Sequence, residues 1–135
     1  MKKLCAGLLL LIFMVFAACS GGGKYGEVKS VMSDYIKANE DAAAALEKAD
    51  TGQAVAKALE PYVEKMTKLS TKMESFDKKF PELKGEPPEE LKELNKKFEE
   101  SLNSFVGMLM PKIMQFVDDP DVKQAMEKFD KMAPK

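Results

Sequence analysis

The side chains able to perform acid–base or nucleophilic chemistry in this chain are carboxylates, lysines and serines, because its 135 residues include no histidine and no arginine. Paired carboxylates can serve as general acid and general base, and the densest acidic group is the five glutamates between positions 89 and 100. These glutamates alternate with Lys92, Lys96 and Lys97 at helical spacing, where opposite charges stabilise a helix by about 0.2–0.5 kcal/mol per pair. The pattern therefore predicts a solvated helix face rather than a catalytic pair.

Serine can act as a nucleophile when a neighbouring base activates it. Ser70, Ser75, Ser101 and Ser104 have no histidine to do so, and no local signature of a serine–lysine arrangement surrounds them. The chain also lacks histidine as a metal ligand, which is the commonest one in proteins. We therefore expect a protein that is not an enzyme and that binds no cofactor.

Three closely spaced aspartates, Asp118, Asp119 and Asp121, could suggest a calcium site. An EF-hand loop needs further oxygen ligands and a central glycine, which this segment lacks. Aspartate is a preferred N-cap and proline fits the first helical position, so Asp119-Pro120 predicts the start of a helix. We expect Asp119 to cap that helix and predict no metal site.

The first residues have the order of a secretory signal peptide. A basic head, Met1–Lys3, precedes the apolar residues 4–18 (LCAGLLLLIFMVFAA), which are fewer than the roughly 20 that a membrane-spanning helix needs. At the end of this run, Phe16-Ala17-Ala18-Cys19 resembles the lipobox of bacterial lipoproteins, in which an apolar residue and two small residues precede an invariable cysteine. The family usually has leucine, valine or isoleucine where this chain has Phe16. The alternative is that Cys19 is an ordinary apolar residue at the end of an uncleaved anchor.

The resemblance implies that residues 1–18 are a lipoprotein signal peptide and that Cys19 becomes the lipidated N-terminus. Cys5 would leave with the signal peptide, so no pair would remain for a disulfide. Each buried methylene of the lipid would contribute about 0.8 kcal/mol to membrane binding. Within the lipoprotein family, a serine after the cysteine, here Ser20, is similar to members sorted to the outer membrane when the host has two membranes. A covalent lipid would then hold the exported protein on a bacterial membrane.

The mature chain would be acidic. Removal of Lys2 and Lys3 leaves 19 lysines against 22 acidic residues, a net side-chain charge of −3. Nucleic-acid binding needs a basic patch, so this charge argues against a nucleic-acid partner. The glycine-rich residues 19–26 (CSGGGKYG) predict a flexible tether between the lipid and a folded domain over residues 27–135.

From residue 27 onward the apolar residues recur in steps of four and three, which is the period of an amphipathic helix. The stripes run over Val28–Ala49, Val55–Phe80 and Leu91–Phe116, and a shorter one runs over Val122–Phe129. Turn and proline signals separate the stripes, and no segment alternates as a strand does. The sequence therefore predicts an all-α fold, an antiparallel helical bundle of three long helices and a short C-terminal helix.

Two prolines fall inside these stripes, Pro61 and Pro111. An interior proline removes a backbone hydrogen bond and costs about 3 kcal/mol, so each predicts a tolerated kink or, for Pro61, a break into two helices. The other interpretation is that paired kinks open an apolar groove, because methionines and aromatic residues lie near both prolines and methionine suits adaptable binding surfaces. The candidate groove residues are Tyr62, Met66, Phe105, Met108, Met110, Met114 and Phe129.

Two functions remain open. In the first, the bundle is a non-catalytic interaction or structural module on the membrane, and its heptads bind another envelope protein or a second copy of the chain, as in a coiled coil. In the second, the bundle binds or senses a lipid or other apolar ligand between its helices. The first requires that the apolar faces close on one another. The second requires a continuous cavity lined by Met66, Phe105, Met108, Met114 and Phe129.

Overall fold

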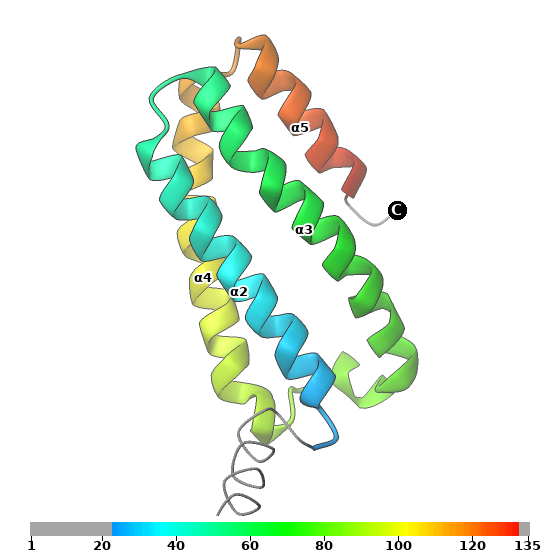
Figure 1. Cartoon of the computed structure of the whole chain (residues 1–135). Helices are drawn as coiled ribbons and strands as arrows, with labels where there is room; N and C mark the ends of the chain where they lie inside the picture. Colours follow the sequence, from blue (N-terminus) through cyan, green and yellow to red (C-terminus); the bar gives the residue numbers. More distant parts are fainter. Residues whose placement is uncertain (1–22, 133–135) are drawn as a thin grey trace, which may run out of the picture.

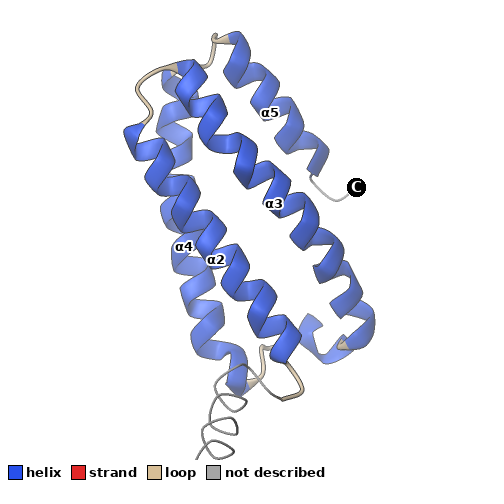
Figure 2. Ribbon diagram, in the orientation of Figure 1, coloured by secondary structure: helices blue, strands red, loops and turns tan. Residues whose placement is uncertain are grey.

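The computed structural model describes residues 23–132, and every regular element in that range is helical (Figure 2). The predicted all-α class is confirmed, since no strand occurs among these residues. None of the described helices combines the length and the apolar composition that a membrane crossing needs. The predicted signal peptide, the lipobox residues 16–19 and the start of the tether lie outside the described residues.

The described elements are α2 (Gly26–Lys48), α3 (Gly52–Lys79), the 3₁₀ turn η1 (Pro81–Lys84), α4 (Glu89–Gln115) and α5 (Pro120–Met132). Successive helices reverse direction and form an elongated bundle (Figure 1). α4 packs along α2, and α5 packs along α3. One end of the bundle therefore contains η1 and the first residues of α2 and of α4. The other end contains the α2–α3 turn and the α4–α5 turn.

Local side chains determine where two of the helices begin. Thr51 has extended backbone angles, and its Oγ1 accepts a hydrogen bond from the N–H of Ala54 at 3.1 Å, which caps α3. Asp119 has the same role at α5, because its Oδ1 accepts a hydrogen bond from the N–H of Asp121 at 2.9 Å. The expected capping by Asp119 is thus confirmed.

Neither interior proline breaks its helix. α3 continues through Pro61, so the break considered there does not occur, and α4 continues through Pro111. Proline has no N–H, so Pro61 leaves the carbonyl oxygen of Lys57 without its helical hydrogen bond, and Pro111 does the same to Gly107. All four of these residues are exposed. Solvent can reach the carbonyl groups that each proline leaves unpaired, and this explains why the bundle tolerates both.

The tightest part of the core lies beside the α2–α3 turn. The almost completely buried aliphatic side chains there are Leu46, Val55, Leu59 and Val122. Each such side chain contributes about 1.5–3 kcal/mol when it leaves water. At the opposite end of the bundle, the rings of Tyr25 and Phe80 lie with their centroids 5.5 Å apart and hold the start of α2 against the end of α3.

A buried chain of hydrogen bonds connects α2, α3 and α4. The Oη of Tyr62 donates to Oδ1 of Asn39 at 3.0 Å, and Nδ2 of Asn39 donates to Oγ of Ser101 at 3.1 Å. The Oγ of Ser101 donates to the carbonyl oxygen of Phe98 at 2.8 Å. Asn39 is only 1% exposed, and a buried polar group without a partner costs about 1–3 kcal/mol. The chain of bonds therefore favours one alignment of the three helices along their axes.

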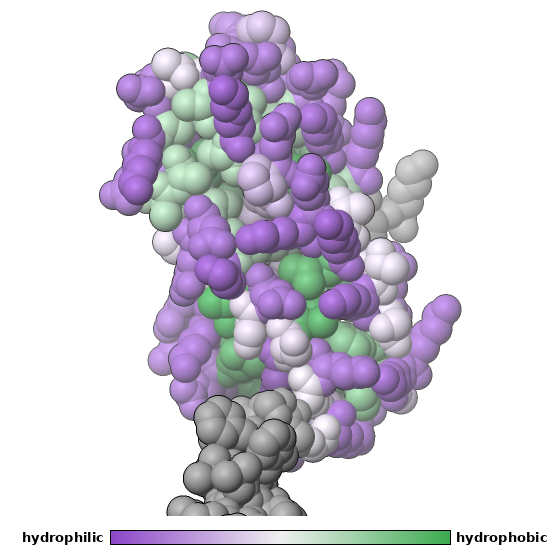
Figure 3. Space-filling view, in the orientation of Figure 1, coloured by the Kyte–Doolittle hydropathy of each residue, from purple (hydrophilic) through white to green (hydrophobic). Residues whose placement is uncertain are grey.

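The charged face expected on the first half of α4 is exposed. Lys92 pairs with Glu89 at 2.7 Å and Lys97 pairs with Glu93 at 3.0 Å, and all four residues are exposed. Exposed pairs of this kind stabilise a protein by about 1 kcal/mol at most. The face of the molecule in Figure 3 is likewise mainly hydrophilic, with hydrophobic patches between the charged side chains.

Candidate functional site: an apolar groove between the helices

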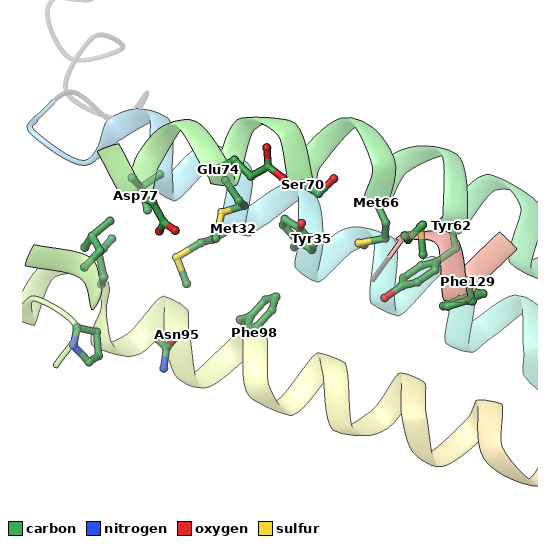
Figure 4. A pocket seen from close by; sticks show the side chains of 16 residues that line it. Met32, Tyr35, Tyr62, Met66, Ser70, Glu74, Asp77, Asn95, Phe98 and Phe129 are labelled. Carbon is green, nitrogen blue, oxygen red and sulfur yellow. The ribbon is translucent and has the colours of Figure 1, made fainter. Parts of the chain in front are cut away.

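A cavity of about 840 Å³ lies between α2, α3 and α4 (Figure 4), and we refer to it as the groove. Small-molecule sites usually enclose about 300–1,000 Å³. Most of its lining is apolar. The lining residues are Val28, Met32 and Tyr35 of α2; Tyr62, Met66, Ser70, Met73, Glu74 and Asp77 of α3; Leu83 of η1; Pro87; Leu91, Asn95 and Phe98 of α4; and Phe129 and Met132 of α5.

The groove follows from how the helices pack. α2 packs against both α3 and α4, whereas α3 and α4 do not pack closely against each other. Where large rings meet, as Tyr62 and Phe105 do, side chains fill the space between α3 and α4. Further along α3, Ser70 is small and Asp77 is polar, so these positions do not fill the space opposite α4.

An aromatic cluster closes one end of the groove. The ring of Tyr62 stacks on Phe105 with centroids 4.3 Å apart and on Phe129 with centroids 5.6 Å apart. Such pairs contribute about 0.5–1.5 kcal/mol beyond the burial of their surface. Met66, one turn further along α3, is buried next to this end. We call this the aromatic end.

Sulfur and aromatic side chains line the middle of the groove. Tyr35 and Phe98 face each other from α2 and α4 in an edge-to-face pair with centroids 5.8 Å apart. Met32 is half-buried, and Met73 is 39% exposed although it belongs to the inward stripe of α3. Methionine adapts its shape to irregular apolar partners, so these walls can adjust to an inserted chain.

The other end of the groove is polar. Asp77 turns its carboxylate into the groove and Glu74 lies at its rim (Figure 4). Asn95 lies opposite, where its Nδ2 donates to Oε1 of Glu99 at 2.9 Å and its Oδ1 stays available as an acceptor. No lysine belongs to the lining. We call this the acidic end.

The two tyrosine hydroxyls of the groove are neutral at physiological pH. Burial raises the pKa of Tyr62 to about 12, and the neighbouring Tyr35 adds to the rise. Burial also raises the pKa of Tyr35. The only charged side chains in the lining are therefore Glu74 and Asp77.

The described start of the chain is attached beside the acidic end. The Nζ of Lys24 pairs with Glu82, and the Oη of Tyr25 donates to Oε1 of Glu82 at 2.9 Å. The hydrogen bond from Lys24, together with a backbone hydrogen bond and that from Tyr25, lowers the pKa of Glu82 to about 2. Leu83, the next residue, lines the groove. Lys24 and Tyr25, which belong to the expected tether, thus lie at the same end of the bundle as the acidic end.

The structure brings together some of the seven candidate groove residues. Tyr62, Met66 and Phe129 line the groove, and Phe105 stacks on Tyr62 without lining it. The candidates that the structure places outside the lining are Met108, Met110 and Met114. Met108 is half-buried against the core, whereas the other two methionines face solvent.

Thirteen of the sixteen lining residues were not among the candidates from the sequence, and the sulfur and aromatic side chains in the middle of the groove are four of them, Met32, Tyr35, Met73 and Phe98. Each belongs to an apolar stripe and was expected to lie in the seam between helices. A stripe predicts which side chains point inward, but it does not tell whether the opposite helix approaches closely enough to bury them. The sequence therefore carries no signal that separates these positions from the core.

The second half of α4 exposes a row of apolar side chains. Leu102, Val106, Met110 and Met114 follow at intervals of four residues and so lie along one side of the helix. Their exposed fractions range from 36% at Leu102 to 72% at Met114, and Val117 follows at 54%. We call these five residues the α4 stripe.

Comparisons of the chain with protein-family models, with curated proteins and with solved structures found no match. Across residues 23–132, no three acidic, histidine or cysteine side chains are grouped so that they could hold a metal ion. The fold and site define an all-helical domain with an apolar groove.

Proposed function

We propose that this chain is a membrane-anchored, non-catalytic envelope lipoprotein whose helical domain binds one apolar chain, such as that of a lipid, in the groove. The observation that carries this proposal is the cavity of about 840 Å³ with an apolar lining. Along α3, the groove extends from Tyr62 to Asp77, a rise of about 22 Å at 1.5 Å per residue. One leaflet of a bilayer's hydrocarbon core is about 15 Å thick, so an acyl chain fits lengthwise.

The exposure of groove side chains supports the same proposal. Met73 is 39% exposed, and Tyr35 and Phe98 are only half-buried, although all three face the inside of the bundle. Cores normally pack to crystal-like density, and an unfilled apolar space loses contacts that a ligand can restore. An inserted apolar chain would supply the missing contacts from all three helices.

The anchor rests on the lipobox resemblance of residues 16–19. Cys19 would carry the covalent lipid, on the outer membrane in a host that has two membranes. The variant Cys19→Ala should lose metabolic labelling by a radioactive fatty acid and accumulate as the uncleaved precursor. If Cys19→Ala keeps the acyl label and remains in the membrane fraction, the lipidation proposal is wrong.

Ligand binding can be tested by filling the groove. Ser70 is half-buried in the lining, so Ser70→Trp would place a large ring in the space that the ligand occupies. Ser104 on α4 is exposed and outside the lining, which makes Ser104→Trp a matched control. Native mass spectrometry of the full chain, gently extracted from membranes, should detect a bound lipid mass in the wild type and in Ser104→Trp but not in Ser70→Trp. A wild-type chain without any additional mass contradicts the proposal.

The α4 stripe favours a second function, self-association on the membrane. A self-complementary contact places the same surface of two copies face to face. It would bury the four exposed apolar residues on one side of α4 and Val117 in the turn that follows. Sedimentation equilibrium of the full chain in detergent should then show a dimer that Met110→Glu dissociates. Ser104→Glu, which adds the same charge on a different side of α4, should leave the dimer intact. A wild-type monomer contradicts this second function.

A further inference from the structure

We infer that the groove binds an amphiphile with a cationic, hydrogen-bond-donating head group, a long-chain amine rather than a fatty acid, with the head at the acidic end. The inference rests on the proposed ligand-binding function and adds the chemistry and the direction of the ligand. Its basis is the difference between the two ends of the groove. The stacked rings of Tyr62, Phe105 and Phe129 close one end, and Glu74 and Asp77 lie at the other.

The direction in which the ligand lies in the groove follows from the free-energy cost of burying polar atoms. A head group at the aromatic end would lie against side chains whose polar atoms are already used, because the Oη of Tyr62 donates to Asn39. An ionised group without partners is very costly to remove from water. The acidic end offers polar partners at the rim of the groove, so the head group lies there and the apolar tail points towards Tyr62.

The available polar atoms at the acidic end are hydrogen-bond acceptors. Glu74 and Asp77 contribute ionised carboxylates, which can only accept. Asn95 uses its Nδ2 as a donor to Glu99, so its free atom is the acceptor Oδ1. An ammonium group donates up to three hydrogen bonds and so suits an end of the groove that offers acceptors, whereas a carboxylate head would donate none.

The charge of the acidic end is not neutralised by the protein. No lysine Nζ among the described residues lies within 4.0 Å of a carboxylate oxygen of Glu74 or Asp77. The neighbouring Lys79 points elsewhere and pairs with Glu27 at 2.6 Å, and Lys92 pairs with Glu89 at 2.7 Å. An anionic head group would meet two acidic side chains and no cation in the lining, so the site disfavours fatty acids.

Next to the acidic end, aromatic rings add to the preference for a cation. Tyr35 and Phe98 form their edge-to-face pair inside the groove, on the side of Tyr62 that leads towards Asp77 (Figure 4). Cations are attracted to the faces of such rings within about 6 Å. A head group that moves along the groove therefore stays in a cation-favouring region between the carboxylates and the Tyr35–Phe98 pair.

The chain offers a direct test because it contains no tryptophan. The variant Met73→Trp introduces one fluorophore at the groove wall, where it replaces a long side chain that is already 39% exposed and so adds much less volume to the groove than Ser70→Trp does. Met114→Trp introduces one in the exposed α4 stripe outside the groove. Each full-length variant is reconstituted in vesicles of zwitterionic phosphatidylcholine. Three brominated amphiphiles of equal chain length, an amine, an alcohol and a carboxylate, are then titrated, because bromine quenches tryptophan fluorescence on contact.

We expect the amine to quench Met73→Trp at a concentration about tenfold lower than the carboxylate, equivalent to about 1.4 kcal/mol. The alcohol should fall between them. Quenching in Met114→Trp reports contact with the amphiphile outside the groove and serves as the baseline. Adding Glu74→Gln and Asp77→Asn to Met73→Trp should remove the preference. The matched control adds Glu47→Gln and Asp50→Asn, an exposed pair of the same types and spacing outside the groove, and should keep the preference.

The outcomes separate the inference from the proposed function. Equal quenching of Met73→Trp by all three amphiphiles, above the baseline, supports an apolar ligand and overturns the head-group inference. A preference for the carboxylate also overturns the head-group inference. The inference is overturned as well if the variant that adds Glu74→Gln and Asp77→Asn to Met73→Trp still prefers the amine. If no amphiphile quenches Met73→Trp above the baseline, both the proposed function and the inference are wrong.

Discussion

The hydroxyl of Tyr62 donates a hydrogen bond to Oδ1 of Asn39 at 3.0 Å, across the interface of α2 and α3. Both side chains are buried, and Asn39 continues the connection to Ser101 of α4. The same Tyr62 ring stacks on Phe105 at the aromatic end of the groove. One tyrosine therefore holds the alignment of the helices with its hydroxyl and closes the groove with its ring.

Asn39→Ala should lower the free energy of unfolding by about 1–3 kcal/mol, because it leaves the buried hydroxyl of Tyr62 without its acceptor. Asn103→Ala on exposed α4 surface should change it by less than about 0.5 kcal/mol. Urea unfolding of both variants, followed by circular dichroism, measures the difference. Equal effects of the two substitutions would show that the buried hydrogen bonds do not stabilise the bundle.

The stability of the domain should fall in alkaline solution through Tyr62. The pKa of this tyrosine is about 12 in the folded chain against an ordinary value of 10.0, so the folded state holds the proton more tightly. The resulting stability is complete below pH 10 and is lost as the pH rises through about 12. Unfolding experiments at increasing pH should therefore find the gap between wild type and Tyr62→Phe constant below pH 10 and shrinking above it. Parallel profiles above pH 10 would contradict the raised pKa.

The stability that the Glu82 carboxylate contributes should be lost in acid. Its pKa of about 2 lies below the ordinary 4.5, because Lys24, the backbone and Tyr25 donate hydrogen bonds to the carboxylate. The stability from this carboxylate is present above pH 4.5 and is lost as the pH falls through about 2. The difference in melting temperature between wild type and Glu82→Gln should close over that interval. A gap that persists at pH 2 would argue against the contact with Lys24.

Two glycine-to-alanine substitutions should change stability in opposite directions. A Cβ at Gly107 meets no atom within 4 Å, so Gly107→Ala should stabilise α4 by about 0.5–1 kcal/mol through helix propensity. A Cβ at Gly52 would overlap the side chain of Asp119, which caps α5 and cannot move away freely. Gly52→Ala should therefore lower the melting temperature, and Gly107→Ala should raise it. An increase for Gly52→Ala would mean that the α4–α5 turn does not approach α3 this closely.

Features that depend on neighbouring residues were predictable from the sequence. The start of α5 follows from Asp119-Pro120, and the end of α3 before Pro81 follows from the restricted backbone angles of a residue that precedes proline. Asn39 interrupts the apolar stripe of α2, but its partners lie 23 and 62 residues further along the chain. The buried hydrogen bonds therefore could not be predicted, because no local pattern selects a partner at such a distance.

The sequence by itself determined that the described chain is helical, which side of each helix faces inward and where the helices end, because period, caps and prolines act within a few residues. Only the tertiary structure decided that α3 and α4 both pack on α2 and leave a groove between them. It also decided that Met73 lines this groove while Met114 faces solvent. Those outcomes depend on distances between helices, and inward-facing apolar residues have the same sequence pattern whether they meet a neighbour or line a cavity.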